Sequence, residues 1–167
     1  DEVEYLSMYS NARYCLTLKK GGWDSFRHYE IILSGCVPFF LDMESLPVST
    51  MVLFPKDLVQ QLMQLPGVPT EEEVSNALAT KAPLRIDHSV FPHAQYEVLR
   101  TLMLEYAAEH LLSQHSATKI CPGEVAPSRV LVHSTANTPQ EPADIMHTLL
   151  VIGFAELGAS VYVNFNI

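Results

Sequence analysis

The feature that most constrains the fold is a strand–helix–strand pattern that occurs twice along the chain. In the first copy, short apolar runs at 12–18 and 37–41 flank an amphipathic segment at 24–34. The second copy occupies 129–167 and contains continuous apolar runs such as Val130-Leu131-Val132, which are typical of parallel strands covered on both faces. Strands joined through a helix pair in parallel, so the sequence predicts an α/β protein.

The predicted architecture is a three-layer α/β/α Rossmann-like domain with a mostly parallel sheet. Residues 1–121 form its first region, 122–128 read as a linker, and 129–167 form a βαβ unit with a helix near 143–157. The strands of this unit either complete the first sheet or begin a second, truncated domain. We favour completion, because an isolated two-stranded unit would leave its apolar faces uncovered.

The remaining segments predict further elements between the two copies. Thr70-Glu71-Glu72-Glu73 has the pattern of a capping box, which marks the start of a helix. Other elements are expected as a short helix at 3–10, an apolar run at 50–55 that could be a strand, and helices at about 56–65, 71–80 and 94–114.

Charge and hydropathy exclude several classes of protein. The chain has 167 residues and a net charge of −9, which argues against nucleic acid as a partner. It contains no apolar run near the roughly 20 residues that a transmembrane helix needs. The chain begins at Asp1, without a methionine or a signal peptide, and enters an element almost at once. We therefore expect a piece of a longer protein.

The number and spacing of the cysteines predict the cellular compartment of the protein. Cys15, Cys36 and Cys121 are odd in number and lack metal-type spacing. Cys15 and Cys36 fall in expected strands, where a free thiol behaves as a small buried hydrophobe. The expectation is therefore reduced, structural cysteines in a cytoplasmic protein.

A glycine turn with two lysines precedes the helix at 24–34. Lys19, Lys20, Gly21 and Gly22 would lie where the N–H groups and dipole of a helix start favour a phosphate. Residues 5–30 carry a local balance of +2, from four basic and two acidic side chains. The alternative is an ordinary loop followed by a surface ion pair of little energetic value.

The segment Asp24-Ser25-Phe26-Arg27-His28-Tyr29-Glu30, followed by Gly35-Cys36-Val37-Pro38, resembles the signature of exostosin-type glycosyltransferases. Tyr14-Cys15-Leu16 and a basic residue before the glycine also match. More broadly, the chain resembles the nucleotide-sugar half of a GT-B glycosyltransferase. The resemblance is good from residue 8 to about 60 and loose to about 115.

The resemblance implies roles for individual residues. Glu30 would bind the ribose or sugar hydroxyls, Arg27 with Lys19 or Lys20 would clamp the diphosphate, and Ser25 would offer a hydroxyl or helix cap. The implied donor site as a whole comprises Lys19, Lys20, Gly21, Gly22, Ser25, Arg27 and Glu30. No catalytic residue, metal or separate cofactor is assigned, since the nucleotide-sugar is itself the substrate.

The chain departs from the pattern at two places. Many GT-B enzymes have a second glutamate eight residues before the first, where this chain has Gly22, and the usual Pro-Arg-Gly turn is replaced by Leu18-Lys19-Lys20-Gly21. Lysine is a point charge without the planar fork of arginine, so these changes put the identity of the sugar in doubt.

The implied function is transfer of a sugar from a nucleotide-diphosphate donor to a carbohydrate or other hydroxyl acceptor. The alternative is a non-catalytic Rossmann-like module that binds a nucleotide or a protein. The enzyme hypothesis requires a lysine of the turn, Arg27 and Glu30 to converge on one open crevice. The sequence also leaves a homo-oligomer open.

Overall fold

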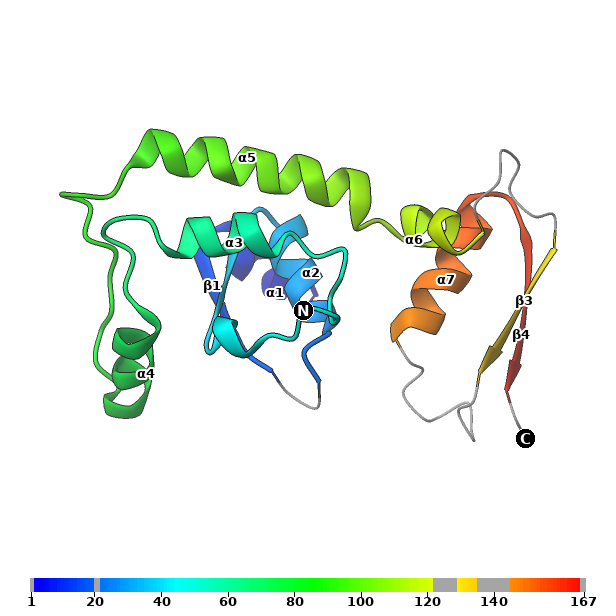
Figure 1. The fold of residues 1–167 in the computed structure, drawn as a ribbon, viewed down its shortest axis with the longest axis horizontal. Helices are drawn as coiled ribbons and strands as arrows, with labels where there is room; N and C mark the ends of the chain where they lie inside the picture. The colour runs from blue at the N-terminus through cyan, green and yellow to red at the C-terminus, as the bar shows by residue number, and fades with distance from the viewer. Residues whose placement is uncertain (1, 20–21, 122–128, 135–144, 166–167) are drawn as a thin grey trace. The chain divides into compact units, whose positions relative to one another are not determined.

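The computed structural model describes residues 2–19, 22–121, 129–134 and 145–165. The chain divides into two compact units, Asp1–Ala108 and Glu109–Ile167. Each is described by itself (Figure 1).

Unit 1 is built on a parallel strand pair with a crossover helix. β1 (Tyr14–Thr17) pairs with β2 (Val37–Phe40) in a register that sets Tyr14 opposite Val37, and α2 (Phe26–Leu33) connects them. All four residues of β2 are buried, whereas β1 alternates, with Cys15 and Thr17 buried and Leu16 exposed. The other elements of the unit are α1 (Glu2–Ser10), the 3-10 helix η1 (Met43–Ser45), α3 (Lys56–Met63), α4 (Glu71–Thr80) and α5 (His93–His110), which ends two residues beyond the unit.

The C-terminus of α2 follows from local chemistry. Gly35 has a φ of +81°, a left-handed conformation that glycine adopts without a Cβ penalty. The Gly35 N–H donates to the Ile32 carbonyl and the Cys36 N–H to the Ile31 carbonyl, as in a Schellman motif. A Cβ at Gly35 would also lie 2.5 Å from Nη2 of Arg100. The helix therefore stops at Gly35, and the next residues begin β2.

Helix α4 begins as the sequence predicts. The Thr70 hydroxyl accepts the N–H of Glu73, and the Glu73 carboxylate accepts the N–H of Thr70. This reciprocal pair is the expected capping box, and it satisfies two N–H groups that a helix start leaves unpaired.

The apolar run at 50–55 is not a strand. Met51 and Phe54 are buried within a turn, where the Phe54 N–H donates to the Met51 carbonyl. The Lys56 ammonium donates to the carbonyls of Pro47, Val48 and Thr50, at 3.3, 3.2 and 2.5 Å. The bond to Thr50 satisfies one carbonyl of the run, and the run forms a turn and not a strand.

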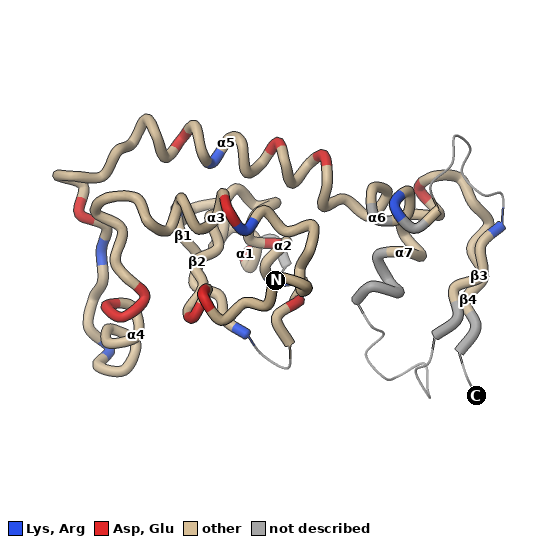
Figure 2. Tube along the Cα trace, viewed as in Figure 1, with Lys and Arg blue, Asp and Glu red and all other residues tan. Residues whose placement is uncertain are grey.

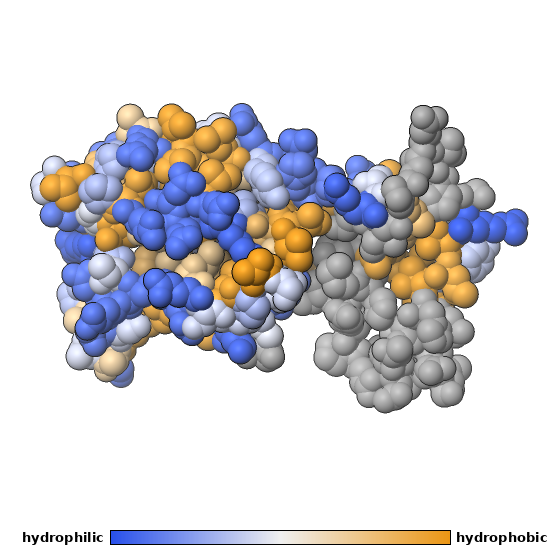
Figure 3. All heavy atoms as spheres, in the orientation of Figure 1, coloured by the Kyte–Doolittle hydropathy of each residue, from blue (hydrophilic) through white to orange (hydrophobic). Residues whose placement is uncertain are grey.

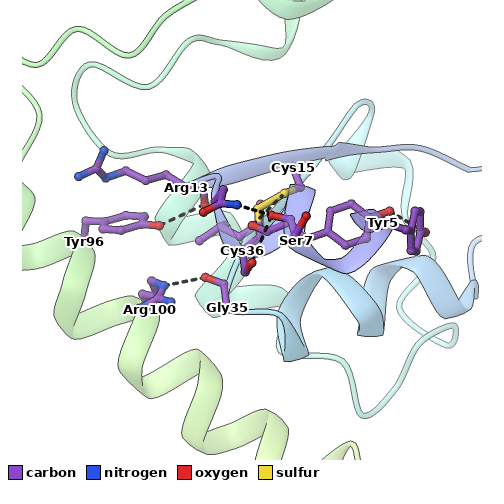
Figure 4. Close-up of a disulfide and its surroundings, with 12 residues drawn as sticks. Tyr5, Ser7, Arg13, Cys15, Gly35, Cys36, Tyr96 and Arg100 are labelled. Carbon is purple, nitrogen blue, oxygen red and sulfur yellow. Dashed lines mark hydrogen bonds between the residues drawn. A yellow bond between two sulfur atoms is a disulfide. The ribbon is translucent and has the colours of Figure 1, made fainter. Parts of the chain in front are cut away.

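Helix α5 is fixed to the start of the strand pair. The Tyr96 hydroxyl donates to the Arg13 carbonyl at 3.1 Å, and Nε of Arg100 donates to the Gly35 carbonyl at 2.7 Å (Figure 4). The expected helix at 94–114 ends earlier, at His110, and a separate helix, α6 (Ser113–Ile120), follows.

Cys15 and Cys36 form a disulfide, which corrects the expectation of reduced cysteines in a cytoplasmic protein (Figure 4). Parallel pairing sets Cys15 opposite Pro38, two positions from Cys36, and the Cα atoms of the two cysteines are 6.1 Å apart. This separation lies within the usual range for a disulfide. Disulfides persist in oxidising compartments, so the bond argues against the cytoplasm. Cys121 is free and exposed.

Unit 2 contains the predicted βαβ unit. β3 (Arg129–Ser134) pairs in parallel with β4 (Ser160–Phe165), and α7 (Ile145–Glu156) connects them. In Figure 1, α6 lies beside α7, and a Cβ at Gly153 would overlap the Ser113 carbonyl oxygen. Glycine at this position is what allows the two helices to approach so closely.

The expectation that β3 and β4 complete the first sheet is not met. In the described part of the chain, β1 pairs with β2 and β3 with β4, in two separate two-stranded sheets. The fold is therefore mixed α/β with short parallel sheets. The predicted linker at 122–128 lies outside the described residues.

Candidate functional site

The predicted donor site lies at the carboxyl end of β1. β1 ends at Thr17 and α2 begins at Phe26, so the connecting loop carries Lys19, Gly22 and Ser25. Ligands of open α/β sheets bind at the carboxyl ends of strands. Ser25 is the N-cap residue in an extended conformation, but its hydroxyl makes no capping bond.

The buried side chain of His28 holds this loop in place. It is fully buried, Nε2 lies 2.8 Å from the Trp23 carbonyl, and Nδ1 lies 2.9 Å from the Thr17 hydroxyl. A carbonyl can only accept, so Nε2 carries the hydrogen and Nδ1 accepts from Thr17 in the neutral ring. Burial lowers the pKa of His28, although the bond to Trp23 opposes the shift. His28 therefore ties the end of β1 to the end of the loop.

Lys19 packs against the only tryptophan of the chain. Its Nζ lies 5.6 Å from the centroid of the Trp23 ring, a cation–π distance, and Trp23 is itself buried. Gly22 has open space around it, since a Cβ there would meet no atom within 4 Å. Lys20 and Gly21 lie outside the described residues.

Glu30 is bound by a hydroxyl from another helix. The Tyr5 hydroxyl of α1 donates to Oε2 of Glu30 at 3.0 Å and accepts from the Tyr9 hydroxyl at 2.7 Å. Burial and the bond with Tyr5 raise the pKa of Tyr9 to about 12, opposed by the positive charge of Arg27. Arg27 and Glu30 are half-buried. The structure thus brings Arg27, Glu30 and two tyrosines of α1 together.

The structure brings the predicted residues together only in part. Arg27 and Glu30 share one side of α2 beneath α1, whereas Lys19 packs on Trp23. Asp24, a candidate cap, instead accepts a hydrogen bond from the Tyr29 hydroxyl at 2.9 Å. Figure 2 shows acidic residues on several elements of unit 1, among them α4 and α5.

Sequence reasoning missed the roles of Tyr5 and Tyr9 and the two hydrogen bonds of His28. Tyr5 and Tyr9 are four residues apart in the predicted helix at 3–10, a spacing that places both rings on one face. That signal was available, but nothing in the sequence indicates that this face covers Glu30. His28 lies next to Arg27 in the chain, yet its ring is turned into the core.

Two cavities of unit 1 are lined by other residues. The first, of about 530 Å³, lies against β1, β2 and the segments on either side of α4. The second, of about 750 Å³, lies between the segment after β2, the C-terminal end of α3 and the N-terminal end of α4. At the second, the Glu71 carboxylate accepts the N–H groups of Asp42 and Met43, at 2.5 and 3.4 Å.

Within the described residues, no group of three or more His, Cys, Asp or Glu side chains is placed to hold a metal ion. None of the helices described there is both long enough and apolar enough to cross a bilayer.

Comparisons with protein-family models, with curated proteins and with solved structures find no match.

Proposed function

We propose that unit 1 binds a nucleotide-diphosphate sugar as the donor-binding part of a glycosyltransferase with a Rossmann-like arrangement. The observation that carries the proposal is the Glu30 carboxylate, which is half-buried and accepts a hydrogen bond from the Tyr5 hydroxyl. A ribose or sugar hydroxyl offers the same donor. Tyr5 then marks the position that a donor hydroxyl occupies when the ligand binds.

The diphosphate would bind beside this position. Arg27 lies one turn before Glu30 on α2, and Lys19 lies in the loop that leads to the helix start. Both charges and the N-terminal dipole favour an anion there. During sugar transfer these groups would stabilise the negative charge that develops on the leaving diphosphate. The acceptor and any general base would come from outside unit 1.

A second candidate is a non-catalytic nucleotide-binding or protein-interaction module. Internal pairing favours it, because Lys19 packs on Trp23 and Glu30 binds Tyr5, so the site residues partly satisfy one another.

Ligand-induced stabilisation tests the binding proposal. Uridine diphosphate and its sugar conjugates are expected to raise the melting temperature, and uridine much less, because it lacks the diphosphate. At 100 times the dissociation constant, a ligand contributes about 2.7 kcal/mol to the free energy of unfolding. Equal shifts for the diphosphate and the nucleoside would contradict the proposal.

Variants of Glu30 and Tyr5 distinguish an effect on ligand binding from an effect on folding. Glu30→Gln removes the charge but keeps the shape, so affinity for the nucleotide-sugar should fall about tenfold to a hundredfold. Glu105→Gln, on the exposed surface of α5, is the matched control and should leave affinity unchanged. Tyr5→Phe removes the competing hydroxyl and should tighten binding. Release of the nucleoside diphosphate in the presence of sugar acceptors distinguishes an enzyme from a module that only binds.

A further inference from the structure

The cavity of about 530 Å³ has an apolar wall formed by the strand pair. Tyr14 and Leu16 alternate along β1, so they project from the same face, and Leu16 lies opposite Phe39 of β2. The Tyr14 ring is held by the Phe39 and Tyr96 rings, whose centroids lie 6.5 and 5.7 Å away. Leu16 is 39 % exposed whereas Phe39 is buried, so the rest of unit 1 covers this face of the sheet only in part.

Segments on either side of α4 form the opposite wall. Val68 and Pro69 precede the helix, Val74 belongs to it, and Leu84 and Ile86 follow it. Leu84 is 42 % exposed. Figure 3 shows other hydrophobic patches among hydrophilic residues on the visible face of the molecule, but this apolar surface borders a cavity of about 530 Å³. That volume lies within the range of small-molecule sites.

Two arginines give the lining of the cavity a positive charge. Arg13, Arg85 and His88 line it, and none of its lining residues is acidic, in a chain with a net charge of −9. Among the residues that the structure describes, neither arginine forms an ion pair with a carboxylate. Arg13 extends along the Tyr96 ring, with its guanidinium carbon 6.0 Å from the ring centroid, a contact that leaves its charge uncompensated (Figure 4).

We propose that this cavity is a binding site for an amphipathic carboxylate, an aromatic or short acyl acid. The apolar part lies between the Leu16–Phe39 face and Leu84, and the carboxylate binds the guanidinium groups at the rim. Guanidinium and carboxylate match in charge and in planar, bidentate geometry. The site is separate from the proposed donor site, since its lining includes neither Arg27 nor Glu30.

The test uses the full chain and two probes of similar shape, 2-naphthoate and the neutral 2-naphthalenemethanol, in calorimetric titrations. The acid is expected to bind about tenfold or more tightly than the alcohol, the difference that a charge-assisted hydrogen bond supplies. Arg13→Gln and Arg85→Gln should each weaken binding of the acid toward that of the alcohol and leave the alcohol unaffected. Arg129→Gln, an exposed arginine of unit 2, is the matched control and should change neither.

The apolar wall is tested with Leu84→Ser, a loop substitution that should weaken both probes while the melting temperature stays near that of the parent chain. Equal affinity for acid and alcohol would overturn the proposal, as would arginine variants that bind the acid normally. Concentration-dependent dimerisation that Leu84→Ser abolishes, without naphthoate binding in the parent chain, would assign this face to a second copy and would also overturn it.

Discussion

Removal of the Cys15–Cys36 disulfide should cost unit 1 a large share of its stability. The bond closes a loop with a sequence separation of 21 residues. In the chain-entropy model, a loop of that length reduces the entropy of the unfolded chain by roughly 11 cal/mol/K, or about 3 kcal/mol at 25 °C. Domains of this size are stable by about 5–15 kcal/mol, so the double variant Cys15→Ala/Cys36→Ala should remain folded but melt at a clearly lower temperature.

The single tryptophan provides a selective assay. Trp23 is buried in unit 1, so its fluorescence during urea unfolding reports on this unit. The double variant, and the parent chain in a reductant, should unfold at similar, lower urea concentrations. Cys121→Ser is the control and should unfold as the parent does, because Cys121 is exposed and free. Thiol titration in denaturant should find one reactive thiol before reduction and three after it. Three before reduction, in protein isolated without a reductant, would refute the disulfide, and equal midpoints would refute the magnitude.

Two further predictions concern His28 and Gly153. The pKa of His28 is lowered in the folded state. As the pH falls, the unfolded chain therefore binds a proton at this residue near pH 6.5, where the folded chain does not. The stability that His28 contributes is complete above that pH and falls as the pH drops toward the lowered pKa. The parent chain should therefore exceed His28→Gln in free energy of unfolding by less at pH 5.5 than at pH 7.5, as measured by urea unfolding. A difference that stays constant would contradict the burial argument. Gly153→Ala should destabilise unit 2 by about 1–3 kcal/mol despite the higher helix propensity of alanine, because the new methyl group would overlap the Ser113 carbonyl. Faster hydrogen exchange in α7 measures the effect, and slower exchange would contradict it.

Elements whose signals are local were predictable from the sequence. The stop of α2 at Gly35 and the start of α4 at Thr70 depend on residues within one turn of the helix end, and both are found as expected. The two strand–helix–strand units were likewise predicted, because each is encoded by contiguous apolar periodicity.

Features that depend on distant segments were not predictable in the same way. The disulfide requires the parallel register of β1 and β2, which no local pattern specifies. The apolar run at 50–55 has the composition of a strand, but its buried residues Met51 and Phe54 lie within a turn. At the candidate site, the helix start and the Arg27–Glu30 spacing were expected. The approach of Tyr5 to Glu30 depends on how α1 packs, across 25 residues of sequence.

The loop between β1 and α2 is anchored at both ends, which affects the energetics of any ligand that binds there. The disulfide joins β1 to Cys36, which lies between α2 and β2, and His28 joins Thr17 to the Trp23 carbonyl. Fixing the backbone of one flexible residue costs about 1–2 kcal/mol, and residues already held by the fold do not incur this cost when a ligand binds. Contacts made beside these anchored residues therefore translate more fully into affinity than they would on a free loop.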